Sequence, residues 1–261
     1  MEPNPFLGLL LHSIGGLAAA SFYIPYKGVK KWKWETYWLV GGFFSWIVAP
    51  WFLAMIILPQ TPMILSEVPF KVLFITWFFG VIWGVGGLTF GLTMRYLGIA
   101  LGYAIALGLC AAFGTLIPPL FSGELLSMVK TSSGQVILLG VFICLGGIAL
   151  SGKAGISKEK ELSDEQKKQS ISEFNFGKGL IFAILAGIMS AAMAYGFAAG
   201  KPIAEIALKN NTPNLWQNLP ILIVVLFGGF VTNCTWCLYL IFKNKLTKDF
   251  FSSPVQGEKF S

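Results

Sequence analysis

Seven long apolar stretches constrain this chain more than any other feature of its sequence. A bilayer core about 30 Å thick is crossed by about 20 residues of apolar helix. The stretches lie at Phe6–Tyr26, Tyr37–Leu58, Val72–Met94, Ile99–Phe121, Val136–Ser151, Gly179–Gly200 and Leu215–Phe242. They predict an all-α polytopic membrane protein with seven transmembrane helices, whose first partner is the lipid bilayer.

The composition supports this interpretation and excludes several other classes of protein. Apolar residues make up 55% of the chain and charged residues only 12%, with a mean hydropathy of +0.71. A soluble domain has about 25% charged residues. The chain is therefore neither a secreted disulfide scaffold nor a disordered regulator, and we expect no nucleic-acid partner in spite of its net charge of +7.

The sequence contains no pattern typical of an enzyme or a metal site. It lacks HExxH, GxSxG and Walker motifs, so we expect no enzymatic activity, no metal and no cofactor. All four cysteines lie inside apolar runs, where they pack as small side chains, and we infer no disulfide. They are Cys110, Cys144, Cys234 and Cys237.

The distribution of positive residues predicts the orientation. Of the 19 Lys and Arg residues, 15 lie in the connections after the first, third, fifth and seventh stretches. Positive connections stay in the cytoplasm. We therefore expect the N-terminus outside and the C-terminus in the cytoplasm.

An internal similarity indicates a repeat. At an offset of 171 residues, Gly8-Leu9 aligns with Gly179-Leu180 and Gly16-Leu17 with Gly187-Ile188. The second copy begins five stretches after the first, so it enters the membrane inverted, as in many secondary transporters. The alternative is chance likeness between apolar helices. The repeat predicts a first five-helix repeat at 1–151, a cytoplasmic linker at 152–178, two helices of an inverted repeat at 179–242 and a cytoplasmic tail at 243–261.

Glycines at four-residue spacing mark the third stretch. Gly80 and Gly84, and then Gly87 and Gly91, form two such pairs. This spacing lets the backbones of two membrane helices approach closely. We expect tight helix contacts here, which in a transporter can also be sliding surfaces.

One histidine is the first candidate for chemistry inside the membrane. Asp and Glu are absent from the seven stretches, and His12, the only histidine, lies about two turns into the first. Ionisable groups at this depth are costly and mark function. An imidazole changes its charge between about pH 5 and 8, so it can couple transport to protons or bind a sugar hydroxyl. The alternative is a neutral histidine bonded to a neighbouring carbonyl.

Hydroxyl and aromatic side chains near the small residues are candidates for binding a substrate. A neutral polyol needs hydrogen-bonding groups and an aromatic platform. The alternative for each residue is packing, or a bond to its own helix backbone. These candidates are Tyr23, Trp83, Thr89, Thr93, Tyr103, Ser190 and Tyr195.

Several motifs resemble one known family. One run extends from His12-Ser13-Ile14-Gly15 to Phe22-Tyr23-Ile24-Pro25. A second, Lys30-Lys31-Trp32-Lys33-Trp34-Glu35-Thr36, follows it. Together they are similar to the opening of the L-rhamnose–proton symporter family, in the drug/metabolite transporter superfamily. Further segments also resemble that family. They are Gly91–Gly98, Phe174-Asn175, Lys178-Gly179 and Lys201-Pro202.

The resemblance implies ten helices in two inverted repeats, sugar import driven by protons, and residence in the bacterial cytoplasmic (inner) membrane. His12 matches the family's histidine and is the residue that we carry over, for proton coupling or sugar binding. The family has asparagines after a Trp-Gly pair, which corresponds to Trp83-Gly84 in this chain. Here Gly87 and Thr89 follow that pair in place of the asparagines. We therefore expect the sugar to be L-rhamnose or a related deoxysugar or hexose.

Two other interpretations stay open. Seven stretches are fewer than the ten helices implied, so the chain is expected to be a truncated form, a nonfunctional fragment, or a protein that works as an oligomer or with a missing C-terminal part. A seven-helix receptor is the less favoured alternative, since a retinal protein needs a buried lysine and Leu215–Phe242 contains none.

Overall fold

The computed structural model describes residues 5–161 and 174–252, and every regular element in those ranges is a helix. Seven helical segments are long and apolar enough to cross a membrane, which confirms the all-α prediction. They are Pro5–Tyr26, Trp34–Ile57, Phe70–Leu97, Ile99–Ser122, Ser132–Ser157, Phe176–Lys209 and Asn214–Lys243.

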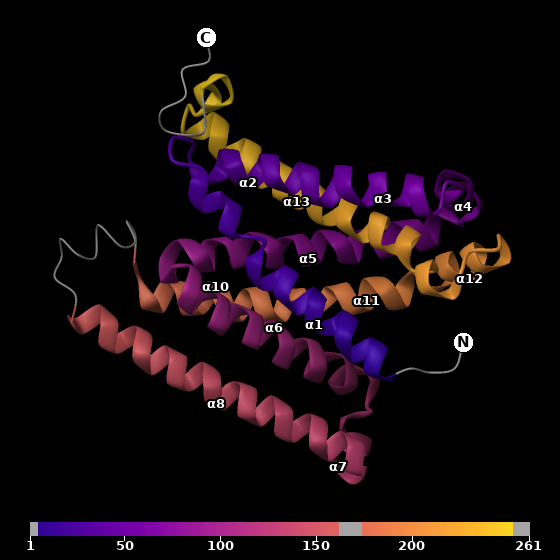
Figure 1. The fold of residues 1–261 in the computed structure, drawn as a ribbon, viewed down its shortest axis with the longest axis horizontal. Helices are drawn as coiled ribbons and strands as arrows, with labels where there is room; N and C mark the ends of the chain where they lie inside the picture. Colours follow the sequence, from indigo (N-terminus) through magenta and orange to yellow (C-terminus); the bar gives the residue numbers. More distant parts are fainter. Residues whose placement is uncertain (1–4, 162–173, 253–261) are drawn as a thin grey trace. The chain divides into compact units, whose positions relative to one another are not determined.

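Figure 1 labels the main helices, whose bounds are as follows. They are α1 (Pro5–Ser21), α2 (Trp34–Phe43), α3 (Ala49–Ile57), α4 (Thr61–Glu67), α5 (Phe70–Leu97), α6 (Ile99–Ser122), α7 (Leu125–Lys130), α8 (Ser132–Glu161), α10 (Phe176–Ser190), α11 (Ala192–Ala199), α12 (Lys201–Lys209) and α13 (Leu219–Lys243). Shorter elements are η1 (Ile24–Gly28), η2 (Phe44–Val48), η3 (Asn214–Trp216) and η4 (Thr247–Phe251).

The chain divides into two compact units, and unit 1 comprises residues 1–37 and 239–261. Within it, the carboxylate of Asp249 on η4 accepts hydrogen bonds from the backbone N–H of Lys33 and the hydroxyl of Thr36, both at 3.0 Å. Trp32 Nε1 donates to the carbonyl of Ser252 at 2.9 Å. An aspartate far along the chain therefore accepts donors at the start of α2, where an anion is favourable.

Unit 2 comprises residues 38–238 and holds a seam of glycines between α5 and α13. The carbonyl oxygen of Val225 occupies the space that a Cβ on Gly80 would need. A Cβ on Gly84 would lie 2.7 Å from the carbonyl oxygen of Gly229. Only glycine permits this separation, so the expected close helix contact exists and its partner is α13.

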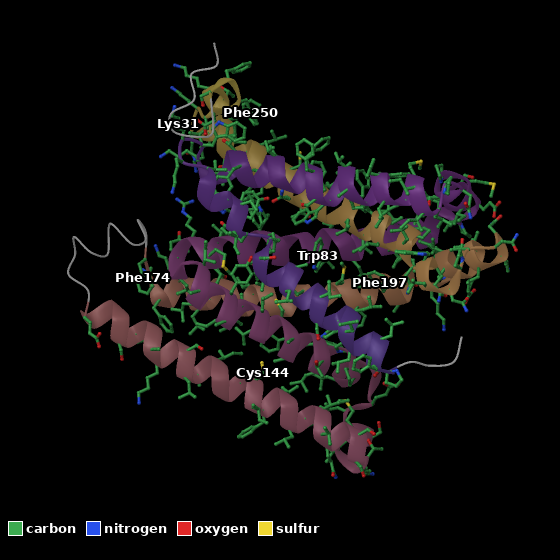
Figure 2. All side chains as sticks on the ribbon, in the orientation of Figure 1. Lys31, Trp83, Cys144, Phe174, Phe197 and Phe250 are labelled. Carbon is green, nitrogen blue, oxygen red and sulfur yellow. The ribbon has the colours of Figure 1, made fainter. Side chains whose placement is uncertain are left out.

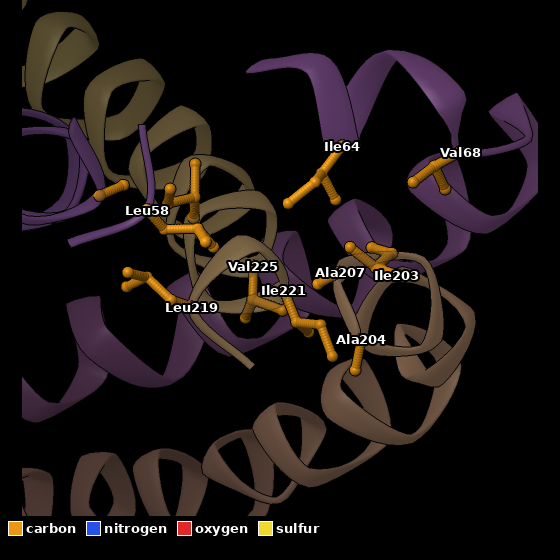
Figure 3. Packing of buried hydrophobic residues seen from close by; sticks show 11 residues of the cluster. Leu58, Ile64, Val68, Ile203, Ala204, Ala207, Leu219, Ile221 and Val225 are labelled. Atoms are coloured by element: carbon orange, nitrogen blue, oxygen red, sulfur yellow. The ribbon is translucent and has the colours of Figure 1, made fainter. Parts of the chain in front are cut away.

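A cluster of buried apolar residues lies at one end of unit 2. Figure 3 shows side chains from α4 and α12 meeting those of α13. The group consists of Ala54, Leu58, Ile64, Val68, Ile203, Ala204, Ala207, Leu219, Ile221, Ile223 and Val225. It joins the ends of the second and sixth spans to the start of the seventh.

Two spans differ from the expected boundaries. The fifth helix does not stop with its apolar stretch at Ser151 but continues to Glu161, because lysine and glutamate are good helix formers and no proline intervenes. The first part of the expected linker is thus helical, while its residues 162–173 lie outside the described ranges. The sixth span is divided at Ala191 and Gly200 into α10, α11 and α12, and Pro202 suits the first turn of a new helix. Of the tail, residues 253–261 also lie outside the described ranges.

Candidate functional site

Two of the predicted residues lie in unit 1. His12 is exposed on α1, a helix on which no residue is buried. Tyr23 is only 5% exposed, and its ring lies 5.2 Å from that of Tyr26. The hydroxyl of Tyr23 lies 3.4 Å from that of Tyr37. Unit 1 therefore contains a small tyrosine cluster after α1.

Two predicted threonines on α5 bond to their own helix. Thr89 Oγ1 donates to the carbonyls of Val85 and Gly86 at 2.9 and 3.0 Å, and Thr93 Oγ1 donates to the carbonyl of Thr89 at 2.8 Å. Thr93 is fully buried. Both hydroxyl protons are thus used within the helix, so only the oxygen lone pairs stay available to a donor.

A polar junction connects α5, α6 and α10. Ser190 ends α10, and its hydroxyl accepts a hydrogen bond from the thiol of Cys110 on α6 at 3.2 Å. A Cβ on Gly86 of α5 would lie 3.2 Å from the backbone nitrogen of Ser190. The Ser190 hydroxyl therefore stands at the break in the sixth span, where three helices meet.

The two other predicted tyrosines, Tyr103 and Tyr195, use their rings for packing. Tyr103 is 8% exposed and lies edge-on to Phe90, with 5.5 Å between centroids. Tyr195 on α11 stacks on Phe79 of α5 at 5.7 Å. The hydroxyl of Tyr195 is buried and has no hydrogen-bond partner among the described residues. The hydroxyl of Thr76 on α5 is likewise buried and has no hydrogen-bond partner among the described residues.

Trp83, labelled in Figure 2, belongs to an aromatic pair on the α13 side of α5. Its ring centroid lies 5.2 Å from that of Trp46, and both side chains are partly buried. Trp46 sits in η2, one turn of π-helix in the middle of the second span. Such turns in a longer helix are frequent at functional sites.

A buried amide lies next to this pair. Asn233 on α13 is fully buried, and its Nδ2 has no hydrogen-bond partner among the residues that the structure describes. Its Oδ1 lies 3.8 Å from the thiol of Cys237, a weak donor. One strong donor is therefore left unsatisfied in the interior of the seventh span.

The amide and Trp46 meet at one glycine, and Trp83 lies against another. A Cβ on Gly42 would lie 2.6 Å from Asn233 Nδ2 and 3.8 Å from a ring carbon of Trp46. A Cβ on Gly229 would lie 2.7 Å from the Trp83 ring. Helices α2, α5 and α13, with η2, thus bring two indoles and one amide together.

Sequence reasoning named Trp83 but missed Trp46 and Asn233. Asn233 carries no charge, and it is neither a hydroxyl nor an aromatic residue, the two types named as binding candidates. An available signal was that Asn233 is a strongly polar side chain near the middle of an apolar stretch. Nothing in the sequence distinguished Trp46 from the other eight of the chain's nine tryptophans.

The chemistry available here is noncovalent binding of a neutral polar molecule. Hydroxyl, amide and indole groups bind through hydrogen bonds and apolar contact, without making or breaking covalent bonds. Among the described residues, no group of three His, Cys, Asp or Glu side chains lies close enough to hold a metal ion.

Comparisons with known proteins agree with this chemistry. A family model described as L-rhamnose-proton symport protein matches residues 1–253. The L-rhamnose-proton symporter of Yersinia pestis bv. Antiqua (strain Antiqua) is 38% identical over 248 residues, which cover 94% of this chain and 71% of that protein. The protein of that name from Yersinia pseudotuberculosis serotype O:1b (strain IP 31758) gives the same identity and coverage. No solved structure matches. The chain therefore belongs to the L-rhamnose-proton symport protein family.

Proposed function

We propose that this protein is a symporter that imports L-rhamnose, or a related deoxysugar or hexose, together with protons by alternating access. The observation that carries the proposal is the family match over residues 1–253, with relatives named L-rhamnose-proton symporter. Seven membrane-crossing helices and the buried hydroxyl and amide groups of unit 2 support it. It is a transporter and not an enzyme.

Alternating access needs two packings of similar halves around one site. The proposed source of these packings is the inverted repeat, with the first span matching the sixth at an offset of 171 residues. The glycine seam supports close helix contacts that can slide. The repeat itself, like the assembly of several copies, stays a prediction.

For the location we propose the bacterial cytoplasmic membrane, with the N-terminus outside. The support is the excess of Lys and Arg in alternate connections. Single cysteines placed at Ser66, between the second and third spans, and at Ser252, after the seventh, test the orientation. An impermeant thiol reagent added to intact cells should label the first and not the second. The opposite pattern would reverse the proposed orientation.

The function is tested by uptake of radiolabelled L-rhamnose into proteoliposomes that contain the full chain. An inward proton gradient should raise the initial rate several-fold, and a protonophore should remove the increase. Uptake that ignores the gradient would contradict symport. Liposomes without protein provide the baseline.

His12→Gln tests the coupling role of the histidine. Glutamine keeps hydrogen-bonding atoms but cannot take up a proton near neutral pH. We expect the stimulation by the proton gradient to fall at least about tenfold. Ser13→Ala is the matched control on α1, because the Ser13 hydroxyl donates to the carbonyl of Leu9 in its own helix. Full stimulation in His12→Gln would remove His12 from the coupling mechanism.

A further inference from the structure

We propose that Asn233 and the Trp46–Trp83 pair form the subsite that holds the sugar, an assignment that rests on the proposed function. In this arrangement the amide of Asn233 donates a hydrogen bond to a sugar hydroxyl. The two indole rings contact the apolar C–H face of the same sugar. The subsite joins η2, α5 and α13.

The unsatisfied amide is the first observation. Asn233 is fully buried and Nδ2 has no protein acceptor in the described ranges. A buried donor without an acceptor costs stability, and the cost is felt more strongly in a low-dielectric interior. A leucine, which has the same number and branching of side-chain heavy atoms, would avoid this cost. A polar ligand that accepts from Nδ2 gives the asparagine a function that leucine cannot supply.

The aromatic pair is the second, independent observation. The two rings lie 5.2 Å apart with an interplanar angle of 57°, so they form two walls of an angle and not a parallel stack. Both are partly buried and therefore keep free surface. Sites for small molecules combine apolar and aromatic walls with few, placed polar groups. A neutral sugar has both kinds of surface.

Gly42 lies beside both the amide and the Trp46 ring. Nδ2 and a Trp46 ring carbon both lie within 4 Å of the position that a Gly42 Cβ would take, at 2.6 and 3.8 Å. The donor and the aromatic wall are thus close enough to contact one hexose together. Because Gly42 has no side chain, it presents only main-chain atoms to the amide.

The local backbone indicates how the amide is uncovered. Gly42 lies near the end of α2, and the π-helical turn Phe44–Val48 follows at once. A turn with i→i+5 bonding is a place where a helix changes its register. Movement of α2 away from α13 would open the amide to the sugar, and its return would close the subsite.

The experiment measures equilibrium binding of radiolabelled L-rhamnose to the purified full chain, with thermal unfolding measured in parallel. The proposal predicts that Asn233→Leu weakens affinity by at least about tenfold, because the hydroxyl loses its donor. The midpoint of unfolding should stay or rise, because an unsatisfied group is removed. A purely structural asparagine predicts the reverse pattern.

One further variant, with two controls, makes the test independent of the folding of Asn233→Leu. Trp46→Leu should also weaken binding about tenfold, since one aromatic wall is lost. The matched controls are Thr235→Val, whose hydroxyl donates to its own helix at Val231, and Trp236→Leu, an exposed indole on α13. Both controls should keep the affinity of the unmodified chain.

The outcomes separate the subsite from the function. Absence of binding to the unmodified chain overturns the proposed function and the subsite together. Binding by the unmodified chain with affinity unchanged within about twofold in Asn233→Leu, or in Trp46→Leu, overturns the subsite alone. Loss of affinity in both variants with retention in both controls supports the assignment.

Discussion

The α5–α13 seam and helix α8 are both apolar and rich in glycine, yet their glycines have different surroundings. Gly80 and Gly84 face the backbone of α13. Gly140, Gly146 and Gly147 on α8 have no neighbouring helix atom within 4 Å of their Cβ positions. The most apolar window of the seventh span is 39% buried and that of the fifth 11%. Glycine therefore serves close packing at Gly80 and Gly84 but has no neighbour to pack against at these three positions of α8.

The surroundings of polar groups also differ between the seam and α8. Asn233 is enclosed in the seam region, and Thr232 Oγ1 donates across it to the carbonyl of Val81 at 2.9 Å. On α8, the thiol of Cys144 lies 3.6 Å from the carbonyl of Gly108, a weak bond. Where lipid supplies no hydrophobic drive, close packing and interhelical hydrogen bonds decide which helices associate. The seam region therefore contains both the contacts that hold the helices together and residues of the proposed binding site.

The largest effect is expected for Gly80→Val in the seam. The valine side chain would occupy the space of the Val225 carbonyl, and a backbone atom cannot move aside without separating α5 from α13. We expect a loss of at least about 3 kcal/mol in the free energy of unfolding. Titration with a denaturing detergent, followed by circular dichroism, measures it. Gly146→Val on α8 is the matched control, and a Gly80→Val protein as stable as that control would refute the seam.

Thr232→Val should have a medium effect. The substitution conserves shape and removes the hydrogen bond to Val81, and such bonds between membrane helices contribute about 0.5–1 kcal/mol. The same titration detects the loss. In Thr235→Val the lost bond is within one helix, to Val231, so its stability should change less. Equal losses in the two variants would mean that the bond across the seam adds nothing.

The smallest effect, and one of opposite sign, is expected for Gly146→Ala on α8. The new methyl group meets no neighbour, and alanine is a better helix former than glycine by about 1 kcal/mol. The free energy of unfolding should stay the same or rise by up to that amount. A measurable fall would show that α8 is closely packed at this glycine.

Only part of the proposed site could be predicted from the sequence. Trp83 was a candidate from sequence, because an indole in a glycine-rich span is suited to a sugar. Its partners Trp46 and Asn233 lie 37 residues before it and 150 after it, and no local pattern connects positions so far apart. Thr89 and Thr93 were candidates on the same reasoning, yet their hydroxyl protons are used within α5.

Sequence alone was sufficient for the number and approximate position of the membrane-crossing helices. A bilayer demands a run of apolar residues of fixed length, and that demand is met within one segment at a time. The contact between Gly80 and Val225, and the enclosure of the Asn233 amide under Gly42, were decided by tertiary structure alone. They depend on which faces of separate helices meet, and hydropathy carries no information about that.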